Sequence, residues 1–124
     1  MHNMIKPVIE LPKDSYPIQS FVLVPVDNIF LRVNLHDIIY LQARGSYVDI
    51  FTAKRQLQVS TNLSSLLRQL PGDCLCRISR KHAINLDYLE KVERRENIYV
   101  HGQKFRLSDN YKSEFFSKML VIRT

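Results

Sequence analysis

The sequence predicts a mainly β domain with about nine or ten short strands, one short helix in the middle of the chain and one helix at the C-terminus. Three observations lead to this fold class. Short runs of β-branched and aromatic residues recur along most of the chain, with turn-forming residues between them. Helical spacing of apolar residues replaces this pattern in only two places. The close succession of the short runs favours antiparallel pairing over a parallel α/β sheet.

The length and composition are those of one globular domain. The chain has 124 residues, of which 45% are hydrophobic and 24% are charged, and these values are close to globular averages. Eighteen Lys and Arg residues against twelve Asp and Glu residues give a net charge of +6. This excess moderately favours phosphate-bearing partners.

Residues 1–20 are expected to form an extended N-terminal arm, and residues 21–124 the folded domain. Pro7, Pro12 and Pro17 recur in the arm at regular intervals. Proline lacks the backbone N–H that a helix interior or a central strand requires, so the arm is predicted to belong to neither.

Five strands are predicted in the first half of the domain, at residues 21–26, 29–34, 38–44, 47–53 and 56–60. The turn signals Asp27–Asn28 and Gly45–Ser46 separate the first two pairs, so each pair is a predicted hairpin. In the fifth strand, Leu57 and Val59 alternate with polar residues, which is typical of a half-buried strand.

The first helix is predicted over residues 63–70. Its apolar positions are spaced at i, i+3, i+4 and i+7, namely Leu63, Leu66, Leu67 and Leu70. Thr61 or Asn62 can serve as the N-cap, and Pro71–Gly72 ends the helix.

Five further strands are predicted at residues 74–78, 83–86, 88–95, 98–101 and 104–107. A terminal helix then begins at Ser108 or Asp109, either of which can cap it. Tyr111, Phe115 and Met119 share one face of this helix and are expected to pack on the domain.

Several classes of protein are excluded by what the sequence lacks. The longest apolar run is far shorter than the roughly 20 residues that cross a bilayer, and the N-terminus does not resemble a secretion signal. We therefore expect a cytoplasmic protein without a membrane partner. The dispersed Gly45, Gly72 and Gly102 cannot form a phosphate-binding loop. Cys74 and Cys76 do not match a zinc motif and are expected to be packed, reduced thiols. The sequence thus predicts no enzyme, no metal and no cofactor.

Three basic or polar turns are candidate nucleic-acid contacts. RISRKH, at residues 77–82, places three fixed positive charges and a histidine together without an acid. Arg44–Tyr47 is a glycine-containing turn with an arginine, a hydroxyl and an aromatic ring, and Asn110 with Lys112 begins the terminal helix. Each turn alone is more simply interpreted as a solvated turn, but three in one small basic domain favour DNA binding.

Four segments also occur in an order typical of a known family. They are DIIYLQARGSYVDIFT (37–52), NLSSLLRQL (62–70), LCRISRKHAINLDYLEKV (75–92) and KFRLSDNYKSEF (104–115). With them, most of the chain resembles the LytTR domain, the mainly β DNA-binding module of many bacterial response regulators. The central stretch of the family is matched by Arg77, Ile78, Arg80, Ile84, Asn85 and Leu86.

This resemblance implies an elongated set of small antiparallel sheets whose loops enter successive major grooves of duplex DNA. The DNA-binding positions that it implies are Arg44, Ser46, Tyr47, Arg80, Lys81, His82, Asn110 and Lys112. Arg80 is expected to contact a guanine and Lys81 a phosphate, unless Arg80 braces the loop against Asp87 or Glu90. Arg77 and Asn85 are expected to be structural, with Asn85 supporting the loop and Arg77 paired near its base.

The chain departs from the family pattern at four positions, with Ser79, Lys81, His82 and Asp109 in place of histidine, serine, tyrosine and arginine. The predicted function is a sequence-specific transcriptional regulator that recognises the major groove through loops. Its expected partner is duplex DNA with direct-repeat or paired sites, bound by a dimer or by tandem copies. Residues 1–20 are too few for the receiver domain usual in the family, so the protein is expected either to stand alone or to have a regulatory protein acting in trans as a further partner. The alternative is a non-catalytic protein-interaction module that has lost specific DNA binding.

Overall fold

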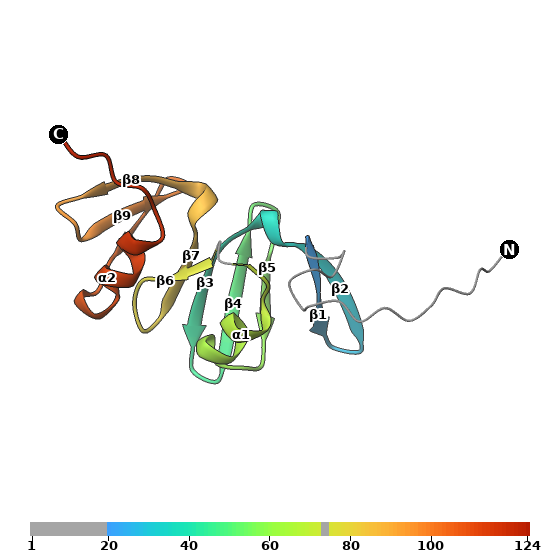
Figure 1. Ribbon diagram of the computed structural model, residues 1–124. Coiled ribbons are helices and arrows are strands. Elements are labelled where there is room, and N and C mark those ends of the chain that lie inside the picture. The colour runs from blue at the N-terminus through green and yellow to red at the C-terminus, as the bar shows by residue number, and fades with distance from the viewer. Residues whose placement is uncertain (1–19, 73–74) are drawn as a thin grey trace, which may run out of the picture.

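Three small antiparallel sheets form the β structure of the chain. The computed structural model describes residues 20–72 and 75–124, which form ten strands, two α-helices and two short 3₁₀ helices. The two-stranded sheet pairs β1 (Phe21–Val26) with β2 (Ile29–Asn34). The three-stranded sheet has the order β10 (Gln103–Arg106), β9 (Asn97–Val100), β8 (Leu89–Glu93). Figure 1 shows the sheets following one another along an elongated molecule, with β1 and β2 at one end and α2 at the other.

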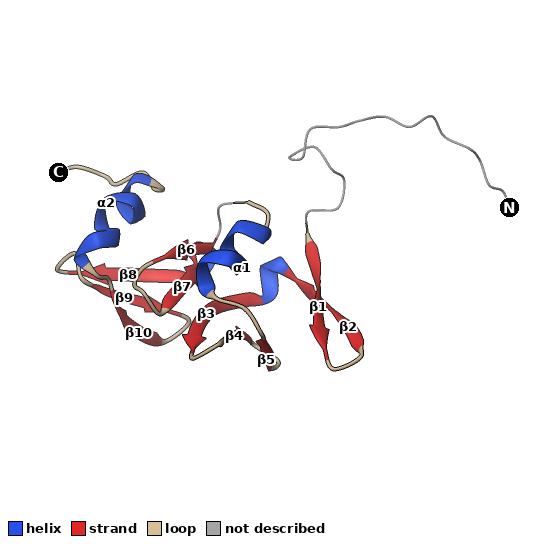
Figure 2. Cartoon of the chain, turned by 90° about the horizontal axis from the view of Figure 1, so that it is seen from below, coloured by secondary structure: helices blue, strands red, loops and turns tan. Residues whose placement is uncertain are grey.

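The five-stranded sheet lies in the middle and joins the two ends. Its strand order is β5 (Gln56–Val59), β4 (Tyr47–Thr52), β3 (Ile38–Arg44), β7 (His82–Asn85), β6 (Leu75–Arg77). The remaining elements are η2 (Leu35–Asp37), α1 (Leu63–Gln69), η3 (Leu86–Tyr88) and α2 (Asp109–Ser117). The mainly β fold class and the elongated set of small sheets are therefore confirmed. Figure 2 shows α1 beside the central sheet and α2 beside the β8–β10 sheet.

The central sheet is buried on both faces, which explains why its middle strand lacks a polar alternation. Leu41 of β3 belongs to the core formed with β1, β2 and α1, whereas Tyr40 belongs to the core formed with β8–β10 and α2. Successive side chains of a strand point to opposite faces, so one strand contributes to both cores. Phe115, the most deeply buried side chain of α2, lies in the second core. The two cores hold the three sheets together.

The helices begin close to the predicted positions. Asn62 is the N-cap of α1, and its side chain accepts a 2.8 Å hydrogen bond from the Ser65 backbone N–H. Ser108 is the N-cap of α2, but its side chain forms no capping hydrogen bond. Neither helix in the described part of the chain is long and apolar enough to span a membrane.

Several predicted strands extend beyond the observed ones, and the largest excess is at residues 88–95. The strand expected at 88–95 ends at Glu93, because Arg94 and Arg95 have positive φ angles of 54° and 58° that a strand cannot contain. The strand expected at 74–78 is β6, which begins at Leu75 and ends at Arg77. The expected arm, apart from Ser20, lies outside the described residues, as does Cys74.

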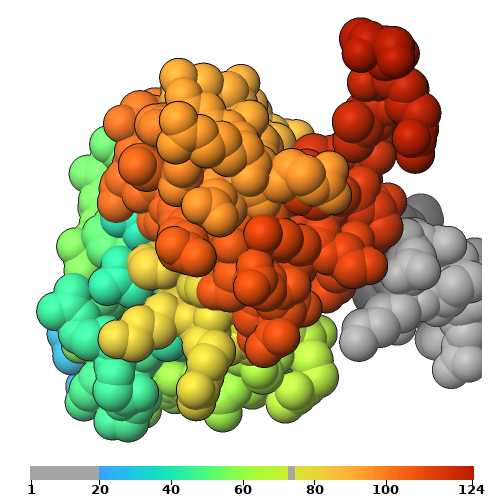
Figure 3. Space-filling view, turned by 90° about the vertical axis from the view of Figure 1, so that its left-hand side faces the viewer, coloured from blue at the N-terminus to red at the C-terminus, as the bar shows by residue number. Residues whose placement is uncertain are grey.

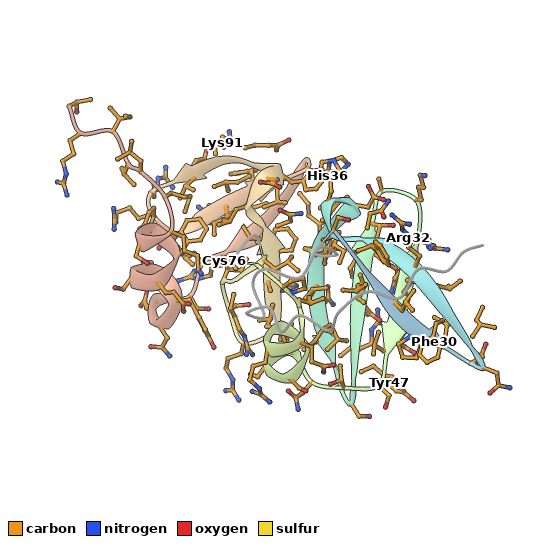
Figure 4. All side chains as sticks on the ribbon, turned by 45° about the vertical axis from the view of Figure 1, so that its right-hand side comes forward. Phe30, Arg32, His36, Tyr47, Cys76 and Lys91 are labelled. Atoms are coloured by element: carbon orange, nitrogen blue, oxygen red, sulfur yellow. The ribbon has the colours of Figure 1, made fainter. Side chains whose placement is uncertain are left out.

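Cys76 is a packed thiol, as predicted. It is buried and free, and burial raises its pKa to about 11. Figure 4 shows its position in the interior. At neutral pH the side chain is therefore a protonated, unreactive thiol. Within residues 20–72 and 75–124, no group of three or more His, Cys, Asp or Glu side chains is placed to hold a metal ion.

Candidate nucleic-acid interface

The three candidate segments meet on one side of the molecule. The Ala43 backbone N–H, next to the β3–β4 turn, donates a 2.8 Å hydrogen bond to the Lys81 carbonyl in the β6–β7 loop. The Ser108 backbone N–H, at the start of α2, donates a 2.9 Å hydrogen bond to the Ile78 carbonyl in the same loop. Figure 3 shows the yellow β6–β7 loop between the teal β3–β4 turn and the orange-red start of α2. Residues far apart in the sequence thus form one surface.

Arg77 holds the backbone of the β6–β7 loop. Its guanidinium donates hydrogen bonds to the carbonyls of Ser79 (3.0 Å) and Arg80 (2.6 Å). A third bond, of 2.7 Å, goes to the Ser64 hydroxyl of α1. The Arg77 guanidinium carbon also lies 5.8 Å from the centre of the Tyr111 ring in α2. The structural role predicted for Arg77 is confirmed, and it links the loop to both helices.

Hydrogen bonds within the β6–β7 loop also stabilise it. The Ser79 hydroxyl accepts hydrogen bonds from the backbone N–H groups of Lys81 (3.3 Å) and His82 (3.1 Å). The Arg80 and Lys81 side chains are exposed and, within the described part of the chain, form no hydrogen bond or ion pair of their own. Arg80 is therefore not braced against Asp87 or Glu90.

His82 lies beneath this loop instead of projecting from it. The ring is half-buried and packs edge-on against Phe105, with 5.1 Å between ring centres. Its two nitrogens lie 3.4 Å from the Ser79 hydroxyl and 3.4 Å from the Gln42 side-chain oxygen. Burial, and next the positive charge of Lys81, lower the pKa of His82. The ring is thus held neutral and in contact with the protein.

Asn85, the last residue of β7, is fully buried and stabilises that end of the strand. Its side-chain N–H donates a 2.7 Å hydrogen bond to the Ile38 carbonyl, and its side-chain oxygen accepts a 2.9 Å bond from the Asp87 backbone N–H. A buried amide needs such partners for both ends, because leaving one unpaired costs about 1–3 kcal/mol. Asn85 is therefore structural, as expected, but its partners lie at the end of β7 away from the β6–β7 loop, so it does not support the loop directly.

The β3–β4 turn presents Ser46 and Tyr47 at its tip. Gly45 has a φ of +59°, a left-handed conformation that glycine adopts without strain, and this lets two residues connect the strands. Ser46 is exposed, and Tyr47 is 44% exposed. Figure 4 places the Tyr47 side chain at the end of the central sheet.

Arg44, at the end of β3, is fixed by a buried carboxylate. Its Nε and Nη2 atoms both lie 2.8 Å from Oδ2 of Asp49 in β4. The other oxygen of Asp49 accepts a 3.3 Å hydrogen bond from the Gln58 side chain in β5. Asp49 is fully buried, whereas the Arg44 side chain is 60% exposed. Sequence reasoning missed Asp49, although an acid within the apolar run YVDIF is an available signal.

The start of α2 presents a cation that is already paired. The Lys112 Nζ lies 3.0 Å from an Asp109 carboxylate oxygen, and this bond lowers the pKa of Asp109. The Lys112 side chain is only 28% exposed, while that of Asp109 is 85% exposed. Asn110, between them, is exposed. Of the three segments, this one presents the weakest positive charge.

The surface therefore combines three kinds of side chain. Arg44 and Arg80 offer planar forks that match a guanine edge or a phosphate, and Lys81 offers a point charge. Ser46, Tyr47 and Asn110 offer hydrogen-bonding groups without charge. Such a set suits a large polyanion better than a small anion, because the groups lie on separate protruding segments.

Comparisons with known proteins agree with this architecture. A family model described as the LytTr DNA-binding domain matches residues 28–120. The sensory transduction protein LytT of Bacillus subtilis (strain 168) is 25% identical over 120 residues, a match that covers 93% of this chain and 49% of that protein. The chain thus spans about half the length of this curated relative.

A solved LytTr DNA-binding domain from Bacillus cereus has the same fold. It superposes with a TM-score of 0.67 at 17% sequence identity, covering 79% of this chain and 94% of the solved domain. The family model extends over most of the sequence, from the turn of the first hairpin to just beyond the terminal helix. The chain belongs to the LytTr DNA-binding domain family.

Proposed function

We propose that the chain is a sequence-specific transcriptional regulator that recognises the major groove of duplex DNA through loops. The observation that carries the proposal is the convergence of the three segments, tied by backbone hydrogen bonds on one side of the molecule. Loops held in this way can present side chains to base edges without a recognition helix. The membership of the LytTr DNA-binding domain family supports the same conclusion.

The β6–β7 loop supplies the central contact in this proposal. Arg80 contacts a base, with guanine O6 and N7 as acceptors, and Lys81 contacts a phosphate. Both side chains are exposed on a braced backbone, so they can reach DNA without a change in the loop. His82 supports the loop from beneath.

The flanking segments contribute further contacts. Arg44, Ser46 and Tyr47 approach DNA from the β3–β4 turn, and Asn110 with Lys112 approaches it from the start of α2. The net charge of +6 favours this association at long range. We further propose that direct-repeat or paired sites bind a dimer or tandem copies, and that a protein acting in trans regulates binding.

The salt dependence of DNA binding tests the proposal. If about six phosphates are neutralised, the logarithm of the binding constant falls with the logarithm of salt concentration with a slope near −5. The duplex is obtained by selecting from random-sequence DNA with the wild-type chain, and affinity is measured by fluorescence anisotropy across a salt series. Random duplex serves as the control.

Specific binding requires a tighter constant for the selected duplex than for random duplex at every salt concentration. Equal affinity for the two, or a slope near zero, would contradict the proposal. A steep slope with equal affinities would leave only non-specific binding to polyanions.

A protein-interaction module is the second candidate function, and exposed apolar residues on the β1–β2 hairpin favour it. Leu23, Ile29 and Phe30 are 57%, 56% and 69% exposed. The same selection separates the two functions. Failure to enrich any duplex, together with a protein captured by the wild-type chain but not by Leu23→Asp/Phe30→Asp, would favour the second.

A further inference from the structure

We infer that Arg44 recognises a guanine in the major groove and that the buried Asp49 is the positioning residue that sets its orientation. This inference rests on the proposed function and adds to it a second base contact outside the β6–β7 loop. It also assigns a role in specificity to a residue that cannot itself touch DNA, since Asp49 is fully buried.

The hydrogen-bond geometry of the guanidinium supports the assignment. Asp49 Oδ2 lies 2.8 Å from both Nε and Nη2, so it occupies one side of the Arg44 fork. A guanidinium has five N–H groups. Three remain after this pairing, two on Nη1 and one on Nη2, and they include a parallel pair along the outer edge. A parallel pair of donors matches the O6 and N7 acceptors of guanine.

The carboxylate is itself held in place by three strands. Asp49 lies opposite Gln42 of β3 and opposite Gln58 of β5 in the sheet register. Gln58 donates a 3.3 Å hydrogen bond to Oδ1, so both oxygens have partners. The anchor for Arg44 is therefore part of the rigid central sheet and not of the turn.

A surface ion pair elsewhere shows why this geometry matters. Lys91 and Glu93 lie 3.4 Å apart, but their side chains are 59% and 48% exposed. Such a pair is screened by water, and Glu93 also accepts a 2.9 Å hydrogen bond from the Tyr99 hydroxyl, so the two charges alone do not fix each other. In contrast, the fully buried Asp49 fixes a 60% exposed Arg44 before any ligand binds. A pre-oriented fork discriminates between bases, whereas a phosphate contact needs only a nearby positive charge.

The test compares substitutions at both ends of the pair on the duplex selected by the wild-type chain. Affinity is measured for every single base-pair change in that duplex, and unfolding is followed in parallel. Arg44→Ala is expected to lose roughly 5- to 150-fold on the selected duplex and to flatten discrimination at one base-pair position. Asp49→Asn is expected to flatten the same position without weakening binding to random duplex. Glu93→Gln, which removes the carboxylate of the exposed pair, is the matched control and leaves the profile unchanged.

A second variant keeps the inference testable if Asp49→Asn does not fold. Arg44→Lys retains the charge near Asp49 but lacks the planar fork, so it is expected to lose discrimination at that position and to bind random duplex more tightly than Arg44→Ala does. Retention of the full profile by Arg44→Lys, or by a folded Asp49→Asn, overturns the inference alone. Failure of the wild-type chain to select any duplex overturns the proposed function and this inference with it.

Discussion

The β3–β4 turn and the β6–β7 loop each present an arginine on the same side of the molecule, but they hold it in opposite ways. In the turn, the side chain of Arg44 is fixed by Asp49. In the loop, the backbone around Arg80 is fixed by Arg77, while the Arg80 side chain is exposed.

The two regions therefore differ in which part of the arginine is fixed before a ligand binds. Fixing the side chain places the loss of rotamer freedom in the folding reaction, so less remains to be lost on binding. Fixing only the backbone leaves the side chain able to adapt to the base or phosphate that it meets. We therefore expect Arg44 to give strict recognition at one position and Arg80 to adapt more readily.

The largest effect is expected from removing the brace of the loop. Arg77→Ala removes three hydrogen bonds and is expected to lower the free energy of unfolding by about 2–3 kcal/mol. It is also expected to weaken DNA binding more than loss of Arg80, because Arg80 and Lys81 both lose their support. Chemical denaturation and anisotropy measure the two effects. Arg68→Ala, on the exposed side of α1, is the control, and an equal loss of binding in it would show that charge alone is responsible.

Arg80→Ala tests the adaptable arginine directly. It is expected to cost roughly 1–3 kcal/mol of binding free energy on the selected duplex and to relax one base-pair position. The thermal midpoint should stay at the wild-type value, because the Arg80 side chain has no partner within the described residues. A variant that is destabilised yet equally selective would contradict the base contact.

Lys81→Ala should weaken binding to selected and random duplex by the same factor. A phosphate contact contributes no base preference, so the logarithmic salt slope should become shallower by about one unit while the preferred sequence stays the same. Titrations over a salt series measure this slope. A change in the base-pair profile would instead place Lys81 on a base.

Asp109→Asn is expected to strengthen DNA binding slightly. The substitution frees Lys112 from its 3.0 Å ion pair and removes a negative charge from the interface. We expect a gain of roughly two- to fivefold at low salt that disappears at high salt, as the interaction is screened. Glu114→Gln, which removes the carboxylate 4.0 Å from Lys118 later in α2, is the control. No gain in Asp109→Asn would place this end of α2 away from DNA.

The smallest effect is expected on the pH dependence of stability, through His82 beneath the β6–β7 loop. The pKa of His82 in the folded chain lies below its usual value of 6.5. The unfolded chain therefore takes up this proton first, so stability is lost as pH falls below about 6.5. His82→Gln should reduce the loss in thermal midpoint between about pH 7 and about pH 5. A loss as large as that of the wild type would assign the acid sensitivity to other groups.

The helices and strands could be predicted from the sequence because the signals for them lie within a few neighbouring residues. The leucine spacing of α1 and the Gly45–Ser46 turn signal depend on neighbours within a few residues, and both are confirmed. The ends of strands were less predictable, since nothing in Arg94–Arg95 marks the left-handed backbone that ends β8.

The bracing of the site could not be predicted in the same way. The pairing of Arg44 with Asp49 depends on the register of β3 and β4, and the bond from Gln58 depends on a third strand. The bonds of Arg77 depend on the path of the loop in space, although its structural role was expected from the family resemblance. The candidate residues were thus predictable, whereas the contacts that orient them were not.

The hydrogen-bond partners of Arg77 determine which substitutions the β6–β7 loop can accept during evolution without a change of backbone conformation. Two of its three hydrogen bonds end on backbone carbonyls, those of Ser79 and Arg80, which every amino acid supplies. Substitutions at positions 80 and 81 can therefore alter the side chains offered to a ligand while the backbone conformation of the loop stays the same. A chain with this loop can therefore acquire new binding preferences by single substitutions at these two positions, without a new loop conformation.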